Sequence, residues 1–174
     1  MLAVNGIIGA MQWQQLASDL GFIPVTGQGF NGGANARTAI AVLLGDEVLL
    51  AAVDSVVDYD PGGELANSVL SLLKPAAARA YCLRIVRGDR DAGRRQFAAA
   101  LFKDLATGDD LPVVGELLGH PDPEVQVWGV ALLRVLAFED EDLATGPYGV
   151  MAREHTNPRV RTAYADNFPD GDDC

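Results

Sequence analysis

The sequence predicts an all-α fold built from antiparallel helix pairs. Between Ala34 and Phe168, apolar residues recur at three- and four-residue intervals, which is the spacing of one face of a helix. Short turns containing Gly, Pro or Asp interrupt this pattern, and such short connections make neighbouring helices pack antiparallel. Strand patterns are nearly absent, since the best candidate, Phe22–Thr26, is short and contains Pro24.

The predicted elements divide the chain into three parts. Residues 1–33 are expected to form an irregular N-terminal cap or arm, residues 34–168 a helical domain, and residues 169–174 a disordered acidic tail. The predicted helices, each bounded by a turn signal, are Gln12–Leu20, Ala34–Leu44, Asp46–Tyr59, Gly63–Leu73, Pro75–Arg87, Asp91–Ala106, Leu111–Leu118, Pro123–Phe138, Asp142–Glu154 and Pro158–Phe168.

Four of these helices share one pattern of apolar or small residues, at offsets of 0, 4, 8 and, in two cases, 11 positions. The matching residues are Val48, Ala52, Val56 and Tyr59; Ala78, Cys82 and Val86; Val125, Gly129, Leu133 and Leu136; and Val160, Tyr164 and Phe168. The first positions are 30, 47 and 35 residues apart, and the helix predicted at 91–106 accounts for the longer interval. The pattern therefore indicates a degenerate repeat with one phase break.

The helix predicted at 123–138 has the clearest local signals. Asp122 is placed to cap the first turn, and Pro123 suits the first helical position because it has no N–H to leave unpaired. An apolar stripe follows at Val125, Trp128, Gly129, Leu132, Leu133 and Leu136. Further apolar residues lie off the stripe, so we expect this helix to be sandwiched between neighbours or covered by a partner.

The segment Leu111–Ala137 (LPVVGELLGHPDPEVQVWGVALLRVLA) resembles a HEAT repeat, a member of the HEAT-like and armadillo-type helical repeat superfamily. It has an apolar first helix, an Asp-Pro turn, a valine after the turn and spaced leucines in the second helix. Thr156–Phe168 is similar to the second helix of another repeat, and Gly45–Tyr59 and Pro75–Arg87 are weaker matches. The resemblance implies stacked helix pairs in a right-handed superhelix, or solenoid, that serves as a binding surface.

Composition restricts the function classes. The chain has 174 residues, 49% of them hydrophobic, and a net charge of −11, which disfavours a nucleic-acid or membrane-surface binder. No apolar run is long enough to cross a membrane. The two cysteines, Cys82 and Cys174, suggest neither a disulfide framework nor a zinc site, so a reducing, cytoplasmic setting is expected.

The charges form alternating bands. Residues 46–75 carry six acids and one base, residues 76–103 seven bases and two acids, and residues 104–150 ten acids and one base. The middle band either binds an anion or an acidic partner, or pairs with the acidic bands within the chain. Together with Val127, Val130 and Arg134 of the helix at 123–138, the middle band supplies the candidate partner-binding residues, which are Arg84, Arg87, Arg90, Arg94, Arg95, Val127, Val130 and Arg134.

Sequence motifs for catalysis, nucleotide binding or metal binding are weak. The segment Gly27–Gly32 has the GxGxxG spacing of a dinucleotide-binding loop, but the strand that should follow is replaced by a predicted helix, so we interpret it as a capping or partner-contacting loop. His120 and His155 lie in turns, and we expect His120 to face solvent near a helix C-terminus. Cys82 is predicted to be a core residue. No catalytic residue, metal site or cofactor is predicted.

Three functions remain under consideration. The first is a non-enzymatic helical-repeat protein that mediates protein–protein interaction as an adaptor or scaffold. The alternative is a small acidic inhibitor or immunity-type protein that binds a basic partner such as a toxin. A relative of the HEAT-like DNA glycosylases, which hold DNA on a basic concave face, is the second alternative, although the acidic flanks of the basic band disfavour nucleic acid.

Overall fold

A computed structural model describes residues 32–138 and 140–169, and the predictions for residues 1–31 and 170–174 lie outside these ranges. All regular elements within the described residues are helical, so the predicted all-α class is confirmed. The helices are α2 (Gly32–Val57), α3 (Gly63–Leu73), α4 (Ala76–Gly88), α5 (Ala92–Leu105), α6 (Leu111–Leu118), α7 (Pro123–Ala137), α8 (Asp142–Thr145), α9 (Pro147–Arg153) and α10 (Pro158–Asn167), with the short 3-10 turn η2 (Gly108–Asp110) before α6.

Two helix boundaries depend on glycine and proline. The helix α2 is kinked at Gly45, whose φ of 74° and ψ of 158° are open to glycine, and the kink falls where the sequence predicts a break. The prediction of a single helix over Asp142–Glu154 is wrong. Pro147 disfavours a helical conformation at Gly146, which is extended with a ψ of −174°, and the segment therefore forms α8 and α9.

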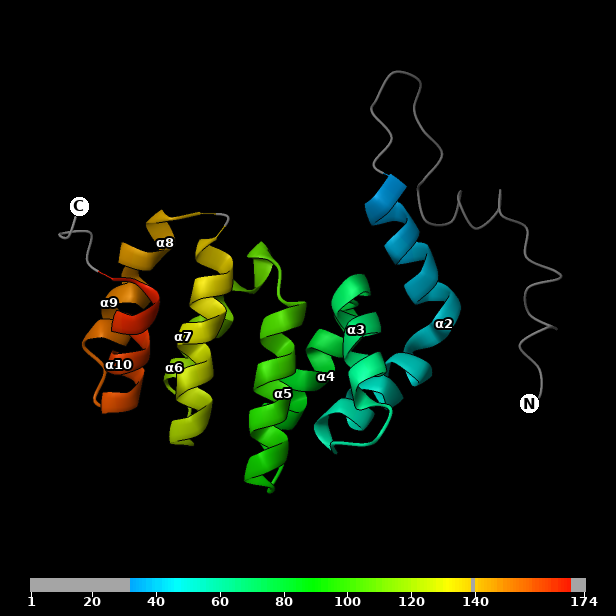
Figure 1. Ribbon diagram of the computed structural model, residues 1–174, viewed down its shortest axis with the longest axis horizontal. Helices are drawn as coiled ribbons and strands as arrows, with labels where there is room; N and C mark the ends of the chain where they lie inside the picture. The colour runs from blue at the N-terminus through cyan, green and yellow to red at the C-terminus, as the bar shows by residue number, and fades with distance from the viewer. Residues whose placement is uncertain (1–31, 139, 170–174) are drawn as a thin grey trace, which may run out of the picture.

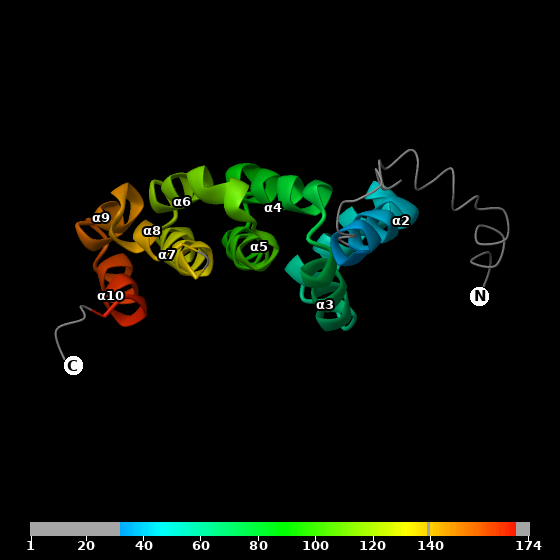
Figure 2. The ribbon, with the colours of Figure 1, turned by 90° about the horizontal axis from the view of Figure 1, so that it is seen from above.

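The helices lie in two layers that follow the long axis of the molecule in chain order (Figures 1 and 2). One layer holds α4, α6 and α9, and the other holds α3, α5, α7 and α10 (Figure 2). Consecutive helices pack as pairs, α4 on α5, α6 on α7 and α9 on α10, while α7 also contacts both α5 and α10. The row bends in a shallow arc with the α3, α5, α7 and α10 layer on its inner side (Figure 2), which we call the inner layer.

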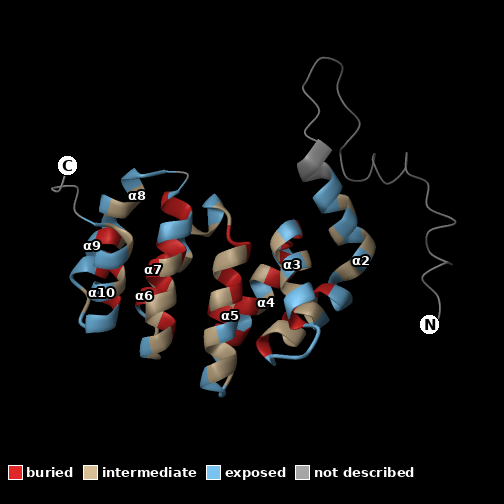
Figure 3. Ribbon diagram, in the orientation of Figure 1, coloured by how far each residue is buried: buried red, intermediate tan, exposed pale blue. Residues whose placement is uncertain are grey.

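The buried residues form one core cluster that runs through the stack of helices, and Figure 3 shows them recurring along it. Leu70, Phe102, Leu117 and Leu133 are among its fully buried side chains. Cys82 is also fully buried, as predicted, and burial raises the pKa of its thiol to about 12. A thiol in this environment stays protonated and packs as an apolar group.

The helix α7 is sandwiched, as the sequence predicts. Every residue of its apolar stripe is buried except Trp128, which is half-buried. A Cβ atom at Gly129 would lie 3.0 Å from both Cγ and the backbone nitrogen of Leu118, so the missing side chain lets α7 approach α6 closely. Another predicted stripe residue, Tyr59, does not join the core: α2 ends at Val57, and Tyr59 lies beyond it in a left-handed conformation with 79% of its surface exposed.

Candidate partner-binding surface

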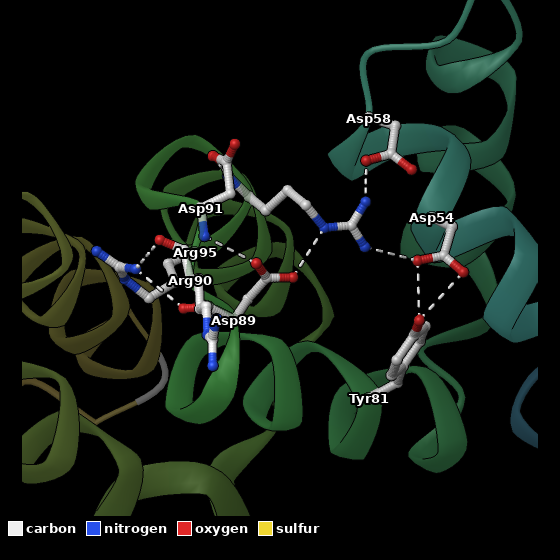
Figure 4. Close-up of polar contacts among 8 residues, drawn as sticks. Asp54, Asp58, Tyr81, Asp89, Arg90, Asp91 and Arg95 are labelled. Atoms are coloured by element: carbon white, nitrogen blue, oxygen red, sulfur yellow. Dashed lines mark hydrogen bonds and ion pairs between the residues drawn. The ribbon is translucent and has the colours of Figure 1, made fainter.

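The arginines of the basic band form ion pairs with acids of the same chain. Arg94, on α5, contacts Asp58 and lies 3.0 Å from both Asp54 and Asp89, so it joins α5 to the end of α2 (Figure 4). The Tyr81 hydroxyl donates to Asp54 at 2.8 Å. Burial and this hydrogen bond raise the pKa of Tyr81 above its ordinary value. This network fixes Arg94 within the fold and leaves its guanidinium occupied.

Three further arginines are paired in the same way. Arg79 lies 3.3 Å from Asp110, and Arg95 lies 2.7 Å from Asp122. Arg87 donates two hydrogen bonds of 2.6 Å to Glu116 and lowers the pKa of that carboxyl. These contacts favour intramolecular pairing over a free partner-binding stripe for these arginines.

The remaining candidate residues do not form one surface. Arg84 stacks on Tyr81 at 4.5 Å, and Arg90 has no side-chain partner among the described residues. Arg134 donates to Asn167 at 2.8 Å on the inner layer. A correction concerns Val130, which is fully buried and cannot contact a partner on the folded protein. Val127 is half-buried against the core.

Three turns, each preceding a helix of the inner layer, repeat one hydrogen-bond pattern, and we call them the turn ladder. In each turn the first residue accepts a hydrogen bond from the backbone N–H two residues later, and that later residue caps the helix. The first residues are Asp89, His120 and His155, with distances of 2.9, 3.0 and 3.0 Å. The capping residues are Asp91, Asp122 and Asn157, each at 3.0 Å.

A side chain on the following helix closes each turn, and two of these side chains also contact the next turn. Arg95, Gln126 and Arg161 donate to the carbonyl oxygens of Asp89, His120 and His155 at 3.0, 2.7 and 2.6 Å. Arg95 also reaches the cap of the second turn, Asp122, and the cap of the third turn donates to Gln126 at 2.9 Å (Figure 4 shows the first turn). The ladder therefore ties successive helix pairs together.

The two histidines belong to this ladder. His120 is half-buried, contrary to the expectation that it faces solvent, because its Nε2 donates to the Val86 carbonyl at 3.1 Å. His155 makes the same contact with the Leu118 carbonyl at 3.0 Å. In both rings Nδ1 accepts from a backbone N–H, so the proton must lie on Nε2. The rings are structural ties between helix pairs.

Sequence reasoning missed the ladder, although a signal was present. Residues 120–125 read HPDPEV and residues 155–160 read HTNPRV, 35 positions later. This short self-similarity places the histidine, the cap and the proline at equivalent positions in two repeats.

The inner layer carries two grooves. The first, which we call the Tyr59 groove, has a volume of about 400 Å³ and lies between the turn after α2, α3 and α5. The rings of Tyr59 and Phe97 lie 5.4 Å apart at this groove. Its acidic members are Asp60, Glu64 and Asp104. Sequence reasoning did not identify it, because Tyr59 matched a core position of the repeat.

The second, which we call the Phe138 groove, has a volume of about 470 Å³ and is lined by α5, α7 and α10. Phe138 is 92% exposed beside Lys103 and Arg134. The Lys103 ammonium lies 5.7 Å from the ring centre of Trp128. The inner layer thus presents one acidic and one basic groove, each with an exposed aromatic ring.

Other kinds of site find little support in the described part of the chain. No three His, Cys, Asp or Glu side chains gather there in a way that would hold a metal ion. None of the described helices has the length and apolar character needed to cross a bilayer. Comparison of the chain with family models, with curated proteins and with solved structures finds no match.

Proposed function

We propose that this chain is a non-enzymatic HEAT-like helical-repeat protein that binds another protein as an adaptor or scaffold. Two observations support a solenoid in which each repeat contacts its neighbours. The helix pairs follow one another along the molecule, and the equivalent turns are 31 and 35 residues apart. Such an arrangement leaves a long inner surface for recognition.

The observation that carries the proposal is the exposure of large apolar side chains on the inner layer. Phe138 and Tyr59 are 92% and 79% exposed, and Phe97 and Val135 are also exposed at the two grooves. Solvent-exposed aromatic side chains next to charged groups are common among the residues that anchor protein interfaces.

Affinity capture with the full chain and two variants tests this proposal. Phe138→Ser should lose the captured partner, because it removes an anchor of the Phe138 groove. Met151→Ser is the control, since Met151 is an exposed apolar residue on α9, in the other layer, and lines neither groove. Equal recovery of the same partner by both variants and by the original chain would contradict a binding site on the inner layer.

A small acidic inhibitor of a basic protein is the second candidate function. It is favoured by the net charge of −11 and by the carboxylates at the Tyr59 groove. Electrostatic steering would make association with a basic partner fall steeply as salt is added. An adaptor anchored mainly by the Phe138 ring would bind its partner with a weaker dependence on salt.

A further inference from the structure

The turn that follows α2 holds an aromatic ring at the mouth of the Tyr59 groove. Tyr59 has a φ of 61°, a conformation that residues with side chains seldom adopt. Backbone bonds from Tyr59 to Val56 (3.2 Å) and from Asp60 to Ser55 (3.0 Å) fix the turn. The ring is consequently held out against Phe97, which is itself 41% exposed. Both rings are therefore exposed at the groove.

The charge at this groove is negative, and two of the three carboxylates in its described lining are unpaired. Neither Asp60 nor Glu64 has an ion pair or a side-chain hydrogen bond within the described ranges, whereas nearby Asp54 and Asp58 are both paired with Arg94. Asp104 pairs with the adjacent Lys103 at 2.8 Å, and the described lining of the groove includes no basic residue. A positive group would meet free carboxylates there.

We propose that the Tyr59 groove receives an arginine side chain of the partner protein; this rests on the proposed binding function and names the chemistry recognised. A guanidinium stacks on aromatic faces and bonds carboxylates through two N–H groups, so it matches both features of the groove. The volume of about 400 Å³ lies within the range of small-ligand sites. A lysine would make the charge contact without the planar stacking.

Titration of the full chain with fluorescein-labelled peptides tests the assignment. The probe is a Gly-Ser peptide carrying two arginines, and its companions replace both arginines by citrulline, which is isosteric and neutral, or by lysine. At low salt we expect the citrulline peptide to bind about tenfold more weakly than the arginine peptide, with lysine between them. Equal binding of arginine and citrulline, or of arginine and lysine, would overturn the assignment.

Variants locate the binding within the groove. Asp60→Asn combined with Glu64→Gln, and separately Tyr59→Ala, should each weaken the arginine peptide by about fivefold or more, while Tyr59→Phe keeps the ring and the affinity. Glu47→Gln combined with Glu141→Gln makes the same change in net charge at exposed residues outside the groove and should leave binding within about twofold. An equal loss in this control would overturn the site.

The peptide titration and the affinity capture can fail independently, so they test the arginine site and the adaptor function separately. If the arginine peptide does not bind while capture remains sensitive to Phe138→Ser, this inference alone fails. If the peptide binds but no partner depends on either groove, the arginine site stands and the adaptor proposal fails.

Discussion

The imidazole Nε2 of His155 lies 3.0 Å from the carbonyl oxygen of Leu118, and so joins the turn before α10 to the end of α6. His120 joins the turn before α7 to the end of α4 in the same way. Each ring also accepts a backbone N–H, so both of its nitrogens are used. The stack of helix pairs is therefore held by polar ties at its turns as well as by its apolar core.

Removal of one tie should destabilise the protein. His155→Ala leaves the Leu118 carbonyl and the Asn157 N–H without these partners, and we expect the free energy of unfolding to fall by about 1–3 kcal/mol. Urea unfolding followed by circular dichroism measures the change. Arg90→Ala, at an exposed residue, should stay within about 0.5 kcal/mol of the original chain. A variant at His155 as stable as this control would show that the histidine ties contribute nothing.

The close approach of α7 to α6 gives a second prediction. Gly129→Ala introduces a Cβ atom 3.0 Å from the Leu118 backbone nitrogen, and the resulting overpacking should cost about 1–3 kcal/mol of stability. Gly88→Ala is the matched control, because a Cβ atom at Gly88 would meet no other atom within 4 Å. Alanine favours the helix more than glycine does, so this variant should be as stable as the original chain or more stable by up to about 1 kcal/mol. Thermal unfolding distinguishes them, and equal melting temperatures would contradict the packing.

A substitution at Arg94 tests whether the basic band stabilises the fold or binds a partner. Arg94→Met leaves Asp54, Asp58 and Asp89 without their shared cation, and we expect a loss of about 1–3 kcal/mol in the free energy of unfolding. Arg90→Met, in the same band but unpaired, should have little effect on stability. Retained stability of Arg94→Met together with lost partner binding would instead support the band as a binding surface.

The ion pair of Arg87 and Glu116 predicts a pH dependence. The hydrogen bond from Arg87 lowers the pKa of the Glu116 carboxyl in the folded protein, so the pair stabilises the fold above the unfolded-state pKa of about 4.3. This contribution is lost as the pH falls through the folded-state pKa. Because Arg87 is largely exposed, Glu116→Gln should cost under about 1 kcal/mol near neutral pH. Acid titration of both proteins should show the difference vanish; a difference that grows at low pH would contradict the pairing.

The helices and boundaries that the sequence predicted correctly are those determined by residues close together in the chain. The cap at Asp122, the proline after it and the apolar stripe of α7 all lie within one short segment, and the structure confirms each of them. The kink at Gly45 likewise depends on one residue. The split between α8 and α9 was missed because the Gly146–Pro147 break was read as part of one helical pattern.

The candidate site could not be predicted in the same way, because its contacts join residues that lie far apart in the sequence. Arg94 meets Asp54 across 40 residues, and the carbonyl that His155 contacts lies 37 residues earlier. The charge bands made internal pairing one of two open alternatives, and only the packing of the helices identifies the partners. Tyr59 matched the spacing of a core residue, but a left-handed turn places its ring at the surface.

Site-specific photocrosslinking tests the binding function most directly. With a photoreactive phenylalanine analogue placed in turn at 97, at 138 and, as a control on the other layer, at 151 in the full chain, we expect one discrete protein adduct from both groove positions and none from position 151. Adducts of equal yield at all three positions, or none at either groove, would contradict a partner-binding inner layer.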